Sequence, residues 1–125
     1  MGMSGRAPGQ TTLRAGTHRY TLRVAADAQA RTKGLGGEHS LPATAGMLFW
    51  FTDDHTRCFW MKDMHFPLDI IWLDATKQVV HIERSVSPAT YPHEFCPAAA
   101  ARYVVELNAG QARAAGIREG QTLTF

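Results

Sequence analysis

The feature that most constrains the fold is a series of short apolar segments separated by residues that form turns. Five such segments follow residue 45, at 46–51, 57–64, 68–74, 79–86 and 102–107. Segments of this length, bounded by Gly, Pro, Asp and Asn, predict β-strands. A parallel crossover needs a dozen residues or more, so strands joined by turns as short as these predict an antiparallel meander.

A strand and a short helix precede this series. Residues 18–28 predict the first strand, because Tyr20 and Leu22 alternate with polar neighbours. Asp27 can accept hydrogen bonds from the free N–H groups of a first helical turn, and Gly34 can end that helix. We therefore expect one or two helical turns between the first strand and a following loop.

The end of the chain predicts a long loop, a second short helix and a last strand. Three prolines make 87–101 an irregular loop, with room for one helical turn at its alanines. Asn108 is a good N-cap for a helix that Gly116 would end, and 121–125 then forms the last strand after a turn at Gly120.

These segments predict a mainly β (α+β) fold with about six or seven short strands and two small helices. An open sheet this small leaves edges exposed, so we expect a closed or nearly closed antiparallel β-barrel. The 125 residues suffice for one core and one domain. We place this domain at 18–125, after a flexible N-terminal segment at 1–17.

The distribution of charge argues against nucleic-acid binding. Residues 1–40 contain six basic and two acidic side chains, whereas the rest of the chain is slightly acidic. These basic residues lie singly among Thr, Ala and Gly, without the cluster or interleaved aromatics of a nucleic-acid interface. We expect no nucleic-acid partner, and we expect a monomer.

The two cysteines leave the compartment open. Cys58 and Cys96 are too far apart in sequence, and too few, for a thiolate zinc site. They allow one disulfide in an oxidising compartment or two thiols in a reducing one, and we favour buried or partly buried thiols. The first twelve residues contain no apolar run that would span a membrane. We expect a soluble protein, periplasmic or exported if a leader was removed and otherwise cytoplasmic.

Several motifs resemble the DUF192 family of uncharacterised proteins, also called UPF0127. They are "GL" at 34–35, "GMLFWF" at 46–51, "FWMK" at 59–62, "PLDIIWLD" at 67–74, "YVVELNAG" at 103–110 and "GIREGQTL" at 116–123. The resemblance covers the chain from about residue 18 and implies a single, mostly β domain without an assigned function. Family members commonly have Asn-Thr after "FWMK", where this chain has Asp63 and Met64.

The stretch that contains "FWMK" supplies the candidate site. Alternation along a strand places Trp60 and Lys62 on one side, where the ammonium group can lie over the aromatic ring. Asp69, on the adjoining strand, is the nearest plausible counter-ion. Trp60, Lys62 and Asp69 could hold an anionic or aromatic ligand, or Lys62 and Asp69 could form a structural salt bridge.

Other chemistries have weaker support. His55, His65 and His93 lie in predicted loops, but their spacing matches no metal-binding motif, so we assign no metal, cofactor or catalytic residue. His93 and Cys96 could form a base and a nucleophile in the 87–101 loop, although no oxyanion donor accompanies them.

We therefore expect a non-enzymatic binding module for an unknown ligand or protein partner. Its groove would be formed by Trp60, Lys62, Asp69 and the 87–101 loop. The alternatives are an enzyme that uses Cys96 or a loop histidine, and an accessory domain that binds another protein through a sheet edge.

Overall fold

The computed structural model describes residues 7–125, which form one six-stranded sheet and two short helices. The strands are β1 (Gln10–Ala15), β2 (His18–Ala25), β3 (Ala45–His55), β4 (Leu68–Leu73), β5 (Val79–Val86) and β6 (Ala101–Asn108). The helices are α1 (Ala28–Lys33) and α2 (Gln111–Ala114), and a 3-10 turn, η1, spans Pro88–Thr90. The predicted mainly β class with two short helices is confirmed.

The strand order is β1-β2-β3-β6-β4-β5, and it differs from a meander. β6 lies between β3 and β4, and β3 pairs in parallel with β2. The connection that contains α1 is long enough for this parallel crossover. Only β4 and β5 pair as consecutive antiparallel strands within the predicted meander, so the meander prediction is wrong.

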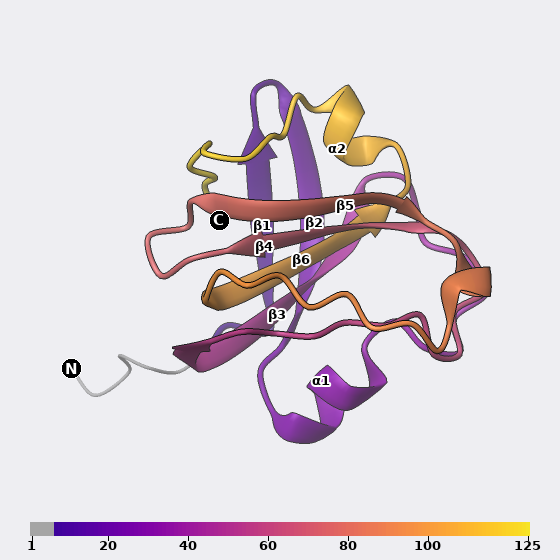
Figure 1. The fold of residues 1–125 in the computed structure, drawn as a ribbon. Coiled ribbons are helices and arrows are strands. Elements are labelled where there is room, and N and C mark those ends of the chain that lie inside the picture. Colours follow the sequence, from indigo (N-terminus) through magenta and orange to yellow (C-terminus); the bar gives the residue numbers. More distant parts are fainter. Residues whose placement is uncertain (1–6) are drawn as a thin grey trace.

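The sheet is strongly twisted and does not close into a barrel. Figure 1 shows β1 and β2 running across the direction of β4 and β5. The C-terminal segment 121–125 lies against both edges: Arg14 N donates to Thr124 O at 2.9 Å, and Leu123 N donates to Lys77 O at 2.9 Å. The predicted last strand is therefore a pair of single bridges that connects the edges of an open sheet.

Both faces of the central strands are covered, which gives two core layers. One layer contains Leu22, Leu48, Ile71 and Val105 and packs with Ala112 of α2, so we call this side the α2 face. The other contains Met47, Phe49, Ile70, Trp72 and Val104 and lies on the side of α1 in Figure 1, and we call it the α1 face. Every residue of β4 is buried, as expected for a strand between two layers.

The strand predicted at 57–64 is wrong. This stretch makes one isolated bridge, between Phe59 and Phe95, and then turns, with Met64 N donating to Met61 O at 3.1 Å. Asp63 has a φ of 60°, in the left-handed region that Asn and Asp tolerate better than most residues. Alternating apolar residues suggested a strand, but the turn at Asp63 ends the extended backbone.

Three boundaries also differ from the predictions. β1 occupies 10–15, inside the segment expected as flexible, and residues 1–6 of that segment lie outside the described part of the chain. β3 continues to His55 through the expected turn. α1 begins as predicted, with the Asp27 carboxylate accepting from Ala30 N at 2.7 Å, but α2 starts after Gly110. Asn108 instead ends β6 and donates to Leu41 O.

Candidate functional site

A cavity of about 850 Å³ lies on the α1 face, between α1, the glycine-rich loop at 34–37 and the segment 58–65. Its apolar lining comes from three elements and consists of Leu35, Phe49, Phe51, Phe59, Trp60 and Met64. Its charged lining consists of Arg31, Lys33, Lys62, Asp63 and Glu106. The site therefore combines an aromatic interior with several cations.

The glycine-rich loop forms one wall because its residues need little space. A side chain at Gly36 would place its Cβ atom 2.9 Å from Lys33 O, and Gly34 packs closely against the Phe49 ring. The loop is bonded to the neighbouring segment, since Gly37 N donates to Asp63 O at 2.9 Å. Close packing and this hydrogen bond thus fix the relative positions of helix α1, this loop and the turn at Asp63.

A disulfide between Cys58 and Cys96 supports the part of the cavity wall that contains Cys58 and Phe59. Beside it, Phe59 N donates to Phe95 O at 3.0 Å and Phe95 N donates to Phe59 O at 2.8 Å. Cys58 and Cys96 are exposed and bonded to each other, so the preference for buried or partly buried thiols is wrong. The bonded sulfur of Cys96 also lacks the free thiol that a partnership with His93 would require.

Lys62 and Trp60 lie at the rim of the cavity. The Lys62 Nζ atom is 5.7 Å from the centre of the Trp60 ring, which confirms the predicted cation–π contact. Trp60 remains 42% exposed and packs against Tyr91, with ring centres 5.1 Å apart. Both predicted residues therefore lie where a molecule entering the cavity would meet them.

Asp69 lies on the other side of the sheet. Its side chain is 1% exposed and accepts from Ser85 N at 2.8 Å and from Ala112 N at 2.9 Å. Burial of the Tyr20 hydroxyl raises the pKa of Tyr20 on the same face, and the charge of Asp69 raises it further. Within residues 7–125 no ion pair joins Asp69 to Lys62, and Asp69 is not part of the cavity lining.

Glu106 is the residue of the site that the sequence analysis missed. It is 4% exposed, lines the cavity and lies opposite Met47 on β3 and Ile70 on β4. Burial raises the pKa of its carboxyl group to about 8. No hydrogen bond from residues 7–125 reaches this carboxyl group. The signal was its position in "YVVEL": in a strand that is apolar on both faces, a glutamate must lie in the core or at a cavity.

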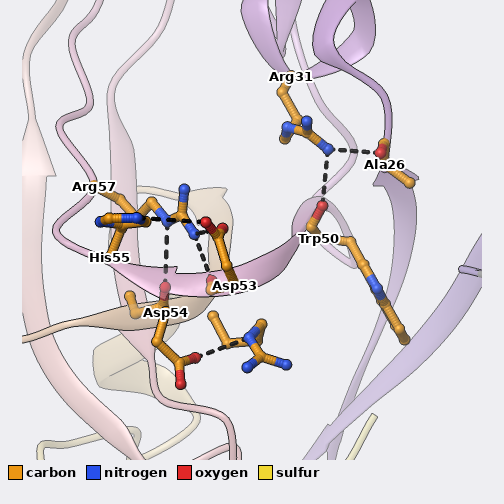
Figure 2. Close-up of polar contacts among 9 residues, drawn as sticks. Ala26, Arg31, Trp50, Asp53, Asp54, His55 and Arg57 are labelled. Carbon is orange, nitrogen blue, oxygen red and sulfur yellow. Dashed lines mark hydrogen bonds and ion pairs between the residues drawn. The ribbon is translucent and has the colours of Figure 1, made fainter. Parts of the chain in front are cut away.

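Two arginines make cation–π contacts with Phe51, which belongs to the aromatic lining of the cavity. Their guanidinium carbons lie over its ring, at 5.1 Å for Arg31 and 3.9 Å for Arg57. Figure 2 shows that Arg31 donates to Ala26 O and Trp50 O, and that Arg57 bonds to Asp53. The hydrogen bond from Arg57 lowers the pKa of the Asp53 carboxyl group.

The three loop histidines do not converge. His65 lines the cavity, with its ring tilted against that of His39 at 5.2 Å between centres. The His55 Nε2 atom lies 3.4 Å from Asp53 Oδ2, and the His93 ring packs edge-on against Phe95. No group of three or more His, Cys, Asp or Glu residues in the described part of the chain could hold a metal ion. These positions give the histidines separate surroundings.

The fold and cavity define a mainly β domain with one mixed sheet and a ligand-sized hollow beneath its first helix. A model of the DUF192 family, described as "Uncharacterized ACR", matches residues 11–125, so the chain belongs to this family. The resemblance seen in its motifs is confirmed.

Two solved structures share this fold. One is a proposed transcription regulator from Sinorhizobium meliloti, with a TM-score of 0.84 and 26% identity over 92% of this chain and 91% of that one. The other is a protein of unknown function from Novosphingobium aromaticivorans, with a TM-score of 0.81 and 26% identity over 93% of this chain and 84% of that one. A search of curated proteins finds no significant match. Among residues 7–125, no helix has both the length and the apolar character to cross a membrane.

Proposed function

We propose that this protein is a non-enzymatic binding domain whose cavity holds a small organic anion with an aromatic or similarly flat apolar body. The observation that carries the proposal is one cavity that joins an aromatic lining to the exposed Lys62–Trp60 pair. Its volume lies in the range of about 300 to 1,000 Å³ that is usual for small-molecule sites.

The charge of the lining favours an anion. Arg31, Lys33 and Lys62 are cations, and Asp63 is the acidic residue beside them. Glu106 adds little negative charge near neutral pH, because burial raises its pKa to about 8. A ligand carboxylate or phosphate would therefore enter a region of positive potential.

Trp60 and Lys62 keep their proposed role in ligand binding, and Asp69 does not. Both oxygens of Asp69 already accept hydrogen bonds from backbone N–H groups on the α2 face. A buried carboxylate with these partners stabilises the fold. The ligand site therefore consists of the cavity and its rim.

The disulfide supports two further parts of the proposal. Because Cys96 is bonded to Cys58, it offers no nucleophilic thiol, which favours binding over cysteine chemistry. Disulfides persist mainly in oxidising compartments, so we place the protein in the periplasm or outside the cell. A monomeric state and the lack of a nucleic-acid partner stay predictions.

The test is a binding titration with a panel of small aromatic carboxylates that includes 4-isopropylbenzoate and 4-acetylbenzoate. We expect saturable shifts in the amide signals of Trp60, Lys62 and Gly36 in 1H–15N spectra. Lys62→Met should weaken binding about fivefold, as expected for one partly exposed ion pair of about 1 kcal/mol.

Arg19→Met is the matched control, since it removes an exposed cation outside the cavity lining. It should leave the dissociation constants unchanged. Absence of saturable binding across the panel, or equal losses in the two variants, would contradict the proposed function.

A further inference from the structure

We infer that Glu106 is a second anchor of the cavity, whose carboxyl group donates a hydrogen bond to a neutral acceptor oxygen on the ligand. This inference rests on the proposed function and narrows the ligand class. The ligand is then an aromatic anion that carries a carbonyl or similar acceptor oxygen apart from its anionic group.

The first step is that the Glu106 carboxyl group is free to bond to a molecule in the cavity. Among residues 7–125 no fully buried side-chain N or O atom lacks a hydrogen bond, so this carboxyl group, which has no protein partner, must be accessible from the cavity that it lines. Glu106 is 4% exposed, and residues 7–125 supply no hydrogen bond to its carboxyl group. Because Glu106 lines the cavity, a bound molecule can supply that bond.

The second step is that the carboxyl group acts as a donor. Its cross-strand neighbours Met47 and Ile70 are apolar, and burial favours the neutral acid, with a pKa of about 8. A neutral carboxyl group carries an O–H donor, whereas the ionised form only accepts. A ligand amine would need the ionised form and would also approach the cations of the lining.

The titratable groups that share the cavity with Glu106 set its electrostatic surroundings. They are Arg31, Lys33, Lys62, Asp63 and His65. Three of the five are cations near neutral pH, and they attract the anionic group of the ligand. The anionic end of the ligand therefore contacts the cations, and its acceptor oxygen contacts Glu106.

The third step is that the backbone holds Glu106 in place. β6 lies between β3 and β4, so Glu106 is bonded within the centre of the sheet. Gly46 on β3 allows this close packing, because a Cβ atom there would lie 2.5 Å from Glu106 O and 2.7 Å from a Leu107 methyl carbon. A side chain on such a rigid element can discriminate between ligands that differ by one acceptor.

The test compares two ligands of matched shape. 4-Acetylbenzoate has a carbonyl acceptor opposite its carboxylate, and 4-isopropylbenzoate replaces that carbonyl with a methyl-bearing carbon. By calorimetric titration at pH 6.5, we expect the wild-type protein to bind 4-acetylbenzoate about five- to tenfold more tightly, the value of one hydrogen bond.

Two substitutions separate the hydrogen bond from shape. Glu106→Met removes the donor at similar volume, and we expect the preference for 4-acetylbenzoate to disappear. Glu106→Gln keeps an N–H donor, so the preference should persist. It should also persist at pH 9.5 in Glu106→Gln, while the wild-type protein loses it as its carboxyl group ionises.

The possible failures are distinguishable. Equal affinities of the two ligands for the wild-type protein, or an unchanged preference in Glu106→Met, would overturn the inference and leave the proposed function intact. If neither ligand binds any variant, the proposed function fails, and the inference fails with it. Lys62→Met serves as the internal check, since it should weaken both ligands equally and keep their ratio.

Discussion

Two buried carboxyl groups illustrate how position decides the role of a residue. Asp69 and Glu106 are nearly inaccessible, and each lies on a central strand. Asp69 accepts two backbone N–H bonds on the α2 face, whereas Glu106 lacks a partner from residues 7–125 and lines the cavity on the α1 face. The first is satisfied by the fold, and the second is available to a ligand.

The ionisation of Glu106 predicts how stability depends on pH. Between pH 5 and pH 8, an unfolded chain has lost the Glu106 proton, while the folded protein keeps it because its pKa is about 8. Raising the pH therefore favours the unfolded state, by about 1.4 kcal/mol per pH unit for one proton. The loss begins near the ordinary pKa of glutamate and stops above pH 8, where both states are ionised.

Glu106→Gln should remove this contribution. We expect the free energy of unfolding of the wild-type protein, measured with urea, to fall by about 3 to 4 kcal/mol relative to Glu106→Gln between pH 5 and pH 8. Other groups titrate in the same way in the two proteins, so the difference isolates Glu106. Parallel curves would show that the folded protein holds this carboxyl group ionised.

Residue-level prediction from sequence succeeded where the interaction was local. The contact of Lys62 with Trp60 joins residues two apart and was predicted, although the strand that was expected to align the two side chains is absent. To see that Asp69 does not pair with Lys62, one must know the strand partners of β4. To identify Glu106 as a site residue, one must know that both faces of β6 are covered. Those facts depend on contacts between distant segments.

The same distinction holds for the elements. The bounds of β5 followed from a short apolar segment between turn residues, and the start of α1 followed from a capping residue; both are local signals. The parallel pairing of β2 with β3 and the insertion of β6 beside β3 bring together segments that local patterns do not relate. The strand prediction for 57–64 was wrong because this segment turns after a single bridge, although its apolar residues alternate as they would in a strand.

The disulfide is the covalent support of the cavity wall. It closes a loop across a sequence separation of 38, for which the chain-entropy estimate gives about 4 kcal/mol. We expect Cys58→Ser, Cys96→Ser and the double variant to lose similar stability, about 2 to 4 kcal/mol, because either substitution removes the whole bond. Urea unfolding with and without a thiol reductant measures this loss.

Ligand affinity should fall with the same substitutions, because Cys58 and the adjoining Phe59 line the cavity. The reduced wild-type protein is the matched control, and it should resemble the variants in both stability and affinity. An additive loss in the double variant would show that each cysteine acts alone and that no bond joins them.

At the scale of the whole molecule, the two faces of the sheet have different roles. The α2 face is filled by apolar side chains from the strands, α2 and the C-terminal segment, whereas the α1 face leaves room for the cavity. A barrel was expected because a small sheet must protect its edges. In the structure, segment 121–125 protects the edges, because it forms hydrogen bonds with Arg14 of β1 and with Lys77, which precedes β5.

This division predicts that the C-terminal segment stabilises the molecule without shaping the site. Leu123 is buried in the α2-face layer, and its N–H group donates to Lys77 O. Leu123→Ala should lower the free energy of unfolding by about 2 to 4 kcal/mol, the usual cost of truncating a buried leucine. Exposed Thr124→Ala is the control, with an expected change within about 0.5 kcal/mol.

Hydrogen exchange and ligand titration then show whether the loss of stability in Leu123→Ala is confined to the α2 face. Loss of Leu123 packing should speed exchange at Arg14 N and Val79 N, which bond to Thr124 O and Gln121 O. Affinity for 4-acetylbenzoate should stay at the wild-type value, because the cavity lies on the opposite face of the sheet. A matching loss of affinity would mean that the two layers open together, and the site would then depend on closure of the sheet edges as well as on the α1 face.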